Sequence, residues 1–120
     1  MKNQPVVVFV ADADRSQAFA KDASVIVFGA DNFRNALSQV IFSYPDVVVL
    51  DARDNVMRAE DTLFHLRTIE HPAIVILSDV PQRWDTVSKT PIIVLGVDSS
   101  HQAIEQAVLA VLAGDTTLIS

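Results

Sequence analysis

The sequence contains no cysteine among its 120 residues, which excludes a disulfide framework and any cysteine-based metal site. Long apolar runs are also missing, because the apolar residues come in short bursts far below the roughly 20 residues that a membrane-spanning helix needs. The N-terminal segment "MKNQPVV" lacks the charged head and long apolar stretch of a signal peptide. These absences predict a cytoplasmic protein that does not enter a membrane.

Basic residues are scarce as well, with 9 Lys and Arg against 15 Asp and Glu and a formal net charge of −6. Binding to a phosphate backbone needs clustered basic residues, so we expect no direct nucleic-acid binding by this segment. Hydrophobic residues make up 50% of the chain and charged residues 20%, a balance typical of a globular protein. The length suits a single domain.

The apolar bursts are continuous and rich in β-branched residues, a pattern typical of strands that are buried on both faces of a parallel sheet. The expected strands are Val6–Val10, Val25–Phe28, Val47–Leu50, Ala73–Leu77 and Ile92–Leu95. Helical patterns lie between them. This alternation predicts an α/β fold with a doubly wound parallel sheet of the flavodoxin type, with the strands in the order 2-1-3-4-5.

The expected helices differ in how clearly the sequence marks them. The last one begins with Ser100 as a cap, ends at Gly114, and places Ile104, Ala107, Val108 and Val111 on one face. The helix between the second and third strands is expected to turn one face inward, made of Phe33, Leu37, Val40 and Ile41. The connections at residues 12–24 and 78–90 leave room for only about two helical turns each, so the first and fourth helices should be short.

Acidic side chains follow two of the strands whose carboxyl ends should meet at the switch point of such a sheet. Asp12 follows the first strand, and Asp51 follows the third. Carboxylates bind Mg²⁺, and a carboxylate can also accept a phosphoryl group. The sequence therefore suggests Asp51 as a nucleophile, Asp12 as a metal ligand, and Ser78, after the fourth strand, as a hydroxyl that senses the phosphoryl group.

The stretch "PDVVVLDARDN", the spacing through "VMRAEDTLFHLR", and "PAIVILS" together resemble a bacterial two-component receiver domain over essentially the whole chain. This resemblance implies that Asp51 is the phospho-acceptor and that the backbone carbonyl of Arg53, rather than its side chain, faces a metal in a solvated loop. It also implies a regulatory role rather than an enzymatic one, with a histidine kinase or other signalling protein as partner.

The resemblance also implies an architecture for the longer protein. Residues 1–114 would form the receiver-like domain, and residues 115–120 would begin a linker or tail before an output domain, expected to be a DNA-binding transcriptional regulator. A homodimer would use the face formed by the expected fourth helix, strand Ile92–Leu95 and the last helix.

Two departures from the receiver pattern weaken the expected chemistry. Ala13 follows Asp12 where receivers carry a second acid, and Gly96 or Val97 stands where they carry a lysine. Mg²⁺ binding should therefore be weak, and the cation that faces an incoming phosphoryl group is missing. The alternative is a phosphorylation-independent pseudo-receiver, an interaction or localisation module such as those N-terminal to pilus-localisation ATPases.

Plainer interpretations remain open for each site residue. Asp51 could simply end a strand, Asp12 could cap the first helix, and Ser78 could bond its own backbone. A flavodoxin-type cofactor binder is disfavoured, because the acidic stretch "ADADRSQ" after the first strand would repel a phosphate.

Overall fold

The computed structural model describes residues 5–53, 55–66, 73–79, 92–95 and 100–113. In chain order the elements are β1 (Val6–Val10), α1 (Ala13–Asp22), β2 (Ile26–Ala30), α2 (Phe33–Ser43), β3 (Val47–Asp51), α3 (Val56–Leu66), β4 (Ala73–Leu77), β5 (Ile92–Leu95) and α4 (His101–Leu112). All strand pairs are parallel, and the strands follow the order β2-β1-β3-β4-β5, which confirms the predicted topology.

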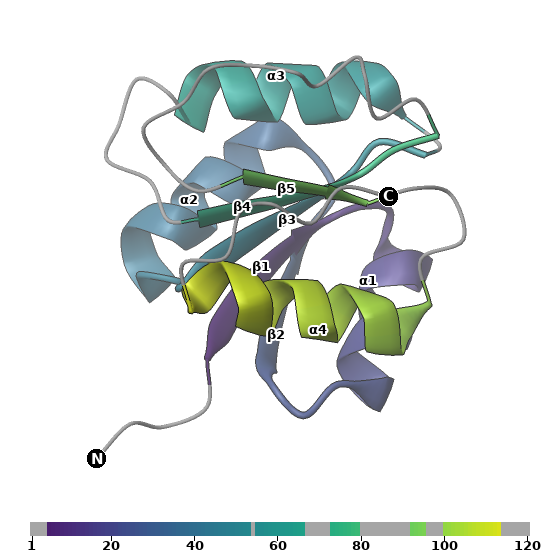
Figure 1. The fold of residues 1–120 in the computed structure, drawn as a ribbon. Coiled ribbons are helices and arrows are strands. Elements are labelled where there is room, and N and C mark those ends of the chain that lie inside the picture. Colours follow the sequence, from purple (N-terminus) through teal and green to yellow (C-terminus); the bar gives the residue numbers. More distant parts are fainter. Residues whose placement is uncertain (1–4, 54, 67–72, 80–91, 96–99, 114–120) are drawn as a thin grey trace.

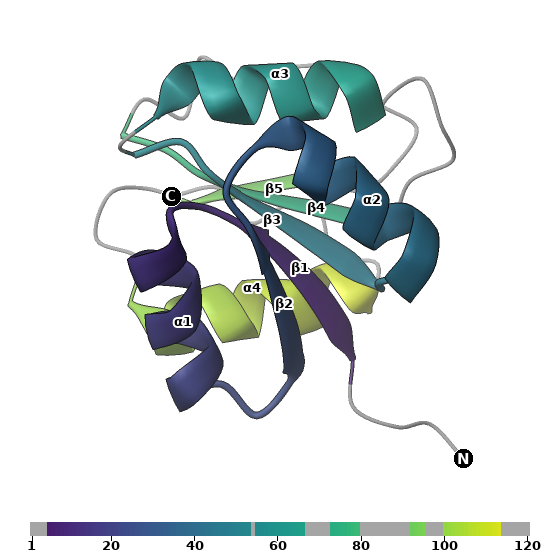
Figure 2. The ribbon, with the colours of Figure 1, turned by 180° about the vertical axis from the view of Figure 1, so that it is seen from behind.

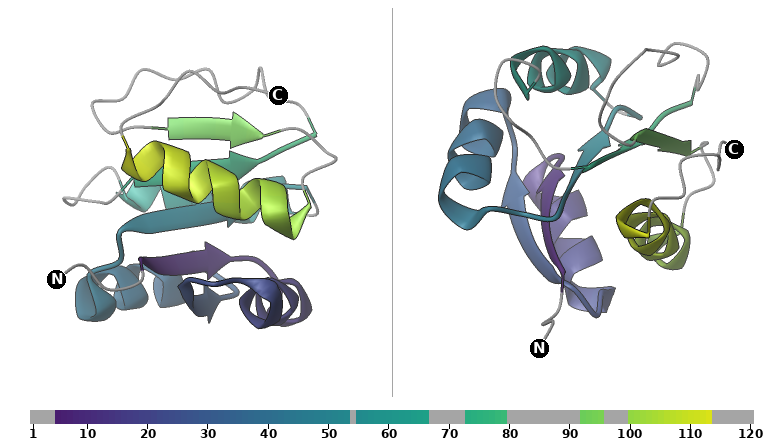
Figure 3. Two further views of the ribbon diagram at one scale, coloured as in Figure 1. Left: turned by 60° about the horizontal axis from the view of Figure 1, so that its bottom comes forward. Right: turned by 60° about the vertical axis from the view of Figure 1, so that its left-hand side comes forward.

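The sheet lies between two layers of helices, with α2 and α3 on one face and α1 and α4 on the other (Figures 1 and 3). Each strand contributes alternate residues to two apolar cores, because successive side chains of a strand point to opposite faces. On β1, Val7 and Phe9 belong to the core under α1 and α4, whereas Val8 and Val10 belong to the core under α2 and α3. This double burial explains why the strands are continuously apolar.

The last helix is confirmed in detail. Ser100 is its N-cap, and the hydroxyl oxygen accepts a hydrogen bond from the backbone N–H of Ala103 at 3.1 Å. All of the predicted inward-facing residues are buried, namely Ile104, Ala107, Val108 and Val111. Gly114, at which we expected the helix to end, lies outside the described residues.

The first helix is longer than predicted. α1 has 10 residues, which makes nearly three turns at about 3.6 residues per turn rather than the expected two. It begins directly after Asp12, so the connection contains almost no loop before the helix. It is still the shortest of the helices in the described part of the chain.

Two expectations about burial were wrong. Ile41 is 56% exposed, because the buried line of α2 runs through Ala36 and Val40 and Ile41 lies about 100° further around the helix. The second strand runs from Ile26 to Ala30 and is partly exposed, since among the described residues it has a neighbouring strand, β1, on one side only. Ile26 and Phe28 are each 39% exposed.

A proline–aspartate pair before β3 aligns the first and third strands. The backbone N–H of Val6 donates to Oδ2 of Asp46 at 2.8 Å, and the N–H of Asp46 donates to the carbonyl of Val6 at 2.7 Å. This exchange ties the start of β3 to the start of β1. Because the two strands are parallel, their carboxyl ends lie at the same edge of the sheet.

Some expectations fall outside the described residues. These are the fourth helix expected between β4 and β5, the boundary at residues 114–115, and the homodimer face that includes that helix. Within the described ranges, no helix is long and apolar enough to cross a bilayer.

Candidate functional site

Asp51 is the last residue of β3, and its side chain is completely buried. The strand register places it opposite Leu77 of β4, and the N–H of Ala52 donates to the carbonyl of Leu77 at 2.8 Å. Ser78 follows Leu77 directly and is also buried, with 2% of its surface exposed. The structure thus places Asp51 at the end of β3 and Ser78 directly after the neighbouring β4, both at the carboxyl edge of the sheet, as predicted.

Asp12 lies just beyond β1 at the same edge and is the N-cap of α1. One carboxylate oxygen accepts a hydrogen bond from the backbone N–H of Arg15 at 3.1 Å. Its side chain is 48% exposed. The plainer interpretation of Asp12 as a helix cap is therefore confirmed, whereas its role as a metal ligand stays a prediction.

Arg53 makes the closest contacts with Asp51. Its Nε donates to Oδ1 at 3.0 Å and its Nη2 donates to Oδ2 at 2.9 Å, so the guanidinium binds both carboxylate oxygens. The backbone N–H of Arg53 also donates to Oδ1 at 3.0 Å. The expectation of a solvated loop does not hold for the Arg53 side chain, which is 19% exposed, because a buried carboxylate is costly without a paired charge and the nearest arginine supplies it. That the Arg53 carbonyl faces a metal stays a prediction.

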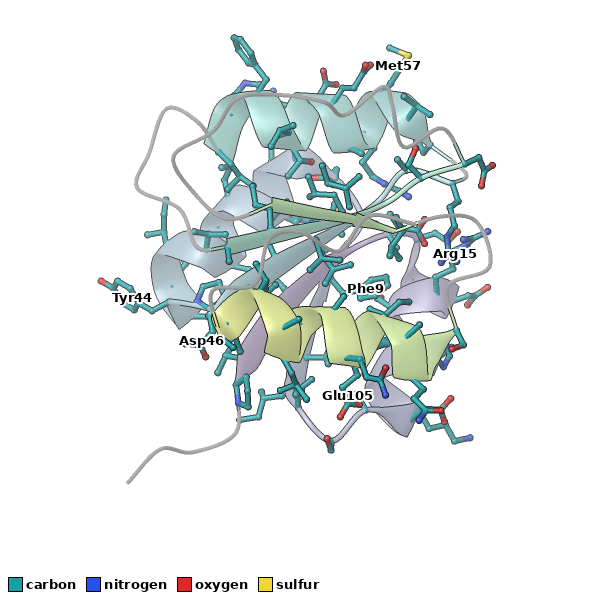
Figure 4. All side chains as sticks on the ribbon, viewed as in Figure 1. Phe9, Arg15, Tyr44, Asp46, Met57 and Glu105 are labelled. Atoms are coloured by element: carbon teal, nitrogen blue, oxygen red, sulfur yellow. The ribbon has the colours of Figure 1, made fainter. Side chains whose placement is uncertain are left out.

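Arg15 contacts both acidic residues at this edge, Asp51 and Asp12. From the first turn of α1, its Nη1 donates to Oδ2 of Asp51 at 3.1 Å, and its Nε lies 3.8 Å from Oδ2 of Asp12. Figure 4 shows Arg15 beside α1, at the end of the molecule opposite Tyr44. We call Asp51, Arg53 and Arg15 the arginine clamp.

The charges around Asp51 favour its ionised form. Burial of the carboxyl by itself raises the pKa of Asp51, but the side-chain and backbone hydrogen bonds and the charge of Arg53, helped by Arg15, outweigh it and lower the pKa below its ordinary value of 3.8. Asp51 is therefore a carboxylate at neutral pH, and its charge is matched inside the protein.

The residues present do not fit a bound Mg²⁺ ion. Magnesium binds through carboxylate oxygens and retained waters, and both oxygens of Asp51 already accept hydrogen bonds from positively charged groups. A guanidinium in this position would also repel a cation. Among the residues that the structure describes, no cluster of three acidic, histidine or cysteine side chains could hold a metal.

Sequence reasoning did not assign a role to either guanidinium. Their positions did carry a signal, because Arg53 stands two residues after Asp51 and Arg15 three residues after Asp12. An arginine so close to an acid at a strand end is well placed to fold back on it. The stretch at residues 96–97, where receivers carry a lysine, lies outside the described residues.

Comparison with known proteins gives a consistent result at the level of structure. No family model and no curated protein matches the sequence. Among solved structures, the chain is similar to the chemotaxis response regulator CheY4 of Vibrio cholerae, with a TM-score of 0.71, 20% identity, and coverage of 91% of this chain and 99% of that one.

Similar values relate the chain to two further receiver domains. The signal receiver domain of a putative Luxo repressor protein from Vibrio parahaemolyticus gives a TM-score of 0.69 at 18% identity, covering 94% and 93% of the two chains. That of the putative response regulator NarL from Mycobacterium tuberculosis gives 0.65 at 23% identity, covering 94% and 99%. The chain has the receiver fold. At these identities the likeness shows the fold and not the chemistry at Asp51.

Proposed function

We propose that this receiver-fold domain regulates or recruits another protein without being phosphorylated, as a pseudo-receiver. The observation that carries this proposal is the arginine clamp, in which both oxygens of the buried Asp51 are bound by Arg53 and one of them also by Arg15. The acceptor position of the fold is present, but its carboxylate is already engaged.

Phosphoryl transfer to a carboxylate requires one oxygen to reach the donor phosphorus in line, with cations placed around the phosphoryl oxygens. The side chain of Asp51 has no exposed surface, and Arg53 is only 19% exposed. The clamp therefore blocks the approach, and it occupies the coordination positions that a metal ion would use. The second acid that would help to bind such an ion is replaced by Ala13.

In this proposal Asp51 has a structural role. It connects the end of β3, the loop after it, and the first turn of α1 through hydrogen bonds to Arg53 and Arg15. A constitutive clamp would hold this edge of the sheet in one conformation, so that the domain presents a fixed surface to its partner. That partner would be a signalling protein or an attached output domain.

One observation favours a second candidate, a phosphorylated receiver that acts on a DNA-binding output domain and has a histidine kinase as partner. Ser78 is buried one residue past Leu77, the residue opposite Asp51, where a hydroxyl could contact a phosphoryl group on Asp51. This candidate requires Arg53 to leave the carboxylate, after which its guanidinium could face the phosphoryl oxygens in place of the absent lysine.

The two candidates are separated by incubating the protein with Mg²⁺ and acetyl phosphate and measuring its intact mass. The proposal predicts no phosphoryl adduct on the wild-type chain. The same measurement is made on an Arg53→Gln variant, in which the clamp is opened, and an adduct on that variant would show that the clamp is what prevents the reaction. An adduct on the wild-type chain that is absent from Asp51→Asn would overturn the proposal in favour of the second candidate.

A further inference from the structure

The strand β2 forms one edge of the sheet, and its outer side has no neighbouring strand within the described part of the chain. The N–H of Ile26 donates toward β1, to Pro5, and the carbonyl of Ala30 accepts from Ala11. In a parallel ladder, residues that alternate with these direct their N–H and C=O groups to the opposite side. Val27 and Gly29 therefore point their backbone groups outward from the sheet.

This edge lacks two of the features that can protect an exposed strand, charged side chains and proline. Its sequence, "IVFGA", contains no charged residue and no proline. Ile26 and Phe28 lie on the α2 side of the strand, in register with Val6 and Val8, and each is 39% exposed. In Figure 2, β2 runs between α1 and α2 at the front of the molecule.

The other side of β2 borders a groove of about 390 Å³ between the strand and α1. The groove exists because the facing residues are small, including Ala13, Ala20 and Gly29. A side chain at Gly29 would place its Cβ 2.6 Å from Oγ and 3.1 Å from Cβ of Ser16, so a larger residue there would force Ser16 to shift. Of the described residues that line the groove, Asp31 is the one with a charge.

The environment of Asp31 leaves its charge available for a positively charged ligand group. Its Oδ1 accepts hydrogen bonds from the neutral side-chain amides of Asn32 at 3.0 Å and Asn35 at 3.1 Å. Amide donors orient a carboxylate without neutralising its charge. A lysine or arginine side chain entering the groove from an added strand would find a carboxylate at its end.

We infer that β2 is a docking edge for an extended segment of a partner protein, which adds to the sheet as a sixth strand and carries basic residues alternating with apolar ones. Alternate side chains of such a segment fall on opposite faces. The basic ones enter the groove toward Asp31, and the apolar ones cover Ile26 and Phe28. The inference concerns a separate surface and does not depend on how Asp51 behaves.

The charge of the chain favours such a partner over a second copy of the same chain. Two copies paired through β2 would bring together two molecules of net charge −6, and the strand itself supplies no basic residue for the groove. A basic segment is attracted both by the net negative charge of the chain and by the carboxylate of Asp31. Backbone hydrogen bonds to Val27 and Gly29 would give affinity, and the alternating pattern would give selectivity.

The test uses the synthetic hexapeptide acetyl-Lys-Val-Lys-Val-Lys-Val-amide as the probe, added to isotopically labelled protein and followed in amide ¹H–¹⁵N spectra. We expect saturable shifts of the amides of β2 and of the residues lining the groove. The same peptide with glutamate in place of lysine should bind much more weakly, because it has the same backbone and apolar face but the wrong charge.

Two variants and one matched control locate the binding. Asp31→Asn should weaken binding about two- to fivefold, the ratio expected for an exposed ion pair, whereas Asp61→Asn, the same charge change at an exposed site on α3, should not. Val27→Pro removes an outward donor without removing a bond to β1 and should weaken binding about tenfold. Asp31 is exposed, so its variant tests the inference even if Val27→Pro does not fold.

Three results would overturn the inference. The first is a set of shifts that lies away from β2, and the second is equal peptide binding by Asp31→Asn and Asp61→Asn. The third is a concentration-dependent dimer in sedimentation that Val27→Pro abolishes, since it would assign the edge to a second copy of the chain.

Discussion

Removal of the guanidinium of Arg53 should destabilise the fold far more than removal of that of Arg15, although both bind the same carboxylate. Arg53→Gln deletes two side-chain hydrogen bonds to Asp51, at 3.0 and 2.9 Å, and leaves the backbone bond in place. Hydrogen bonds to charged groups contribute about 1.5–3 kcal/mol each, and loss of one partner of a buried pair costs about 3–5 kcal/mol. Since Arg53 is 19% exposed and water can partly replace it, we expect a loss of about 3 kcal/mol in the free energy of unfolding.

Arg15→Gln is the matched control for this change. It deletes one bond to the same carboxylate, at 3.1 Å, but the Arg15 side chain is 40% exposed and solvent screens its interaction. Its loss should cost about 0.5–1 kcal/mol.

The assay is urea-induced unfolding at neutral pH for the wild type, both single variants, Asp51→Asn, and the Asp51→Asn/Arg53→Gln double variant. In the Asp51→Asn background, Arg53→Gln should cost less than about 1 kcal/mol, which gives a coupling energy of about 2 kcal/mol between the two residues. Equal losses for Arg53→Gln and Arg15→Gln, or additive losses in the double variant, would refute the reasoning that Arg53 neutralises a buried charge.

Two further predictions follow from the same contacts. Because the pKa of Asp51 is lowered in the folded state, its ionised form stabilises the fold above about pH 4, and this contribution is lost as the pH falls through the folded-state pKa. The difference in free energy of unfolding between wild type and Arg53→Gln, measured with urea, should therefore narrow on acidification. A difference that stays constant with pH would contradict this. Mg²⁺ should not raise the melting temperature of the wild type, because the oxygens of Asp51 are engaged by arginine. Saturable Mg²⁺ binding in a calorimetric titration that disappears in Asp51→Asn would contradict this prediction.

The sequence was sufficient for the parts of the fold that depend on local periodicity. The buried face of α4 could be predicted residue by residue, because helical spacing and the Ser100 cap are both local signals. The strand order followed from the alternation of continuous apolar strands with helices. Ile41 was misplaced because an apolar residue in a helical pattern does not reveal how much of that helix the sheet covers.

The candidate site could likewise be predicted only in part. The positions of Asp12, Asp51 and Ser78 at one edge of the sheet could be predicted, since strand ends in a parallel sheet fix where the following residues lie. The partner of Asp51 could not, because an arginine side chain has several rotatable bonds and its final contact depends on the depth at which the carboxylate is buried. Burial of Asp51 and closure by Arg53 are tertiary properties that the spacing of the motif does not contain.

The state of the Arg53 guanidinium in solution tests the arginine clamp most directly. Hydrogen exchange at the Nε–H groups of the arginines can be measured by ¹⁵N NMR, with Arg34, which is exposed on α2, as an internal reference. We predict that Nε–H of Arg53 exchanges much more slowly than that of Arg34, because it donates to Oδ1 of Asp51, and that this protection is lost in Asp51→Asn. Equal exchange at Arg53 and Arg34 in the wild-type protein would contradict the clamp.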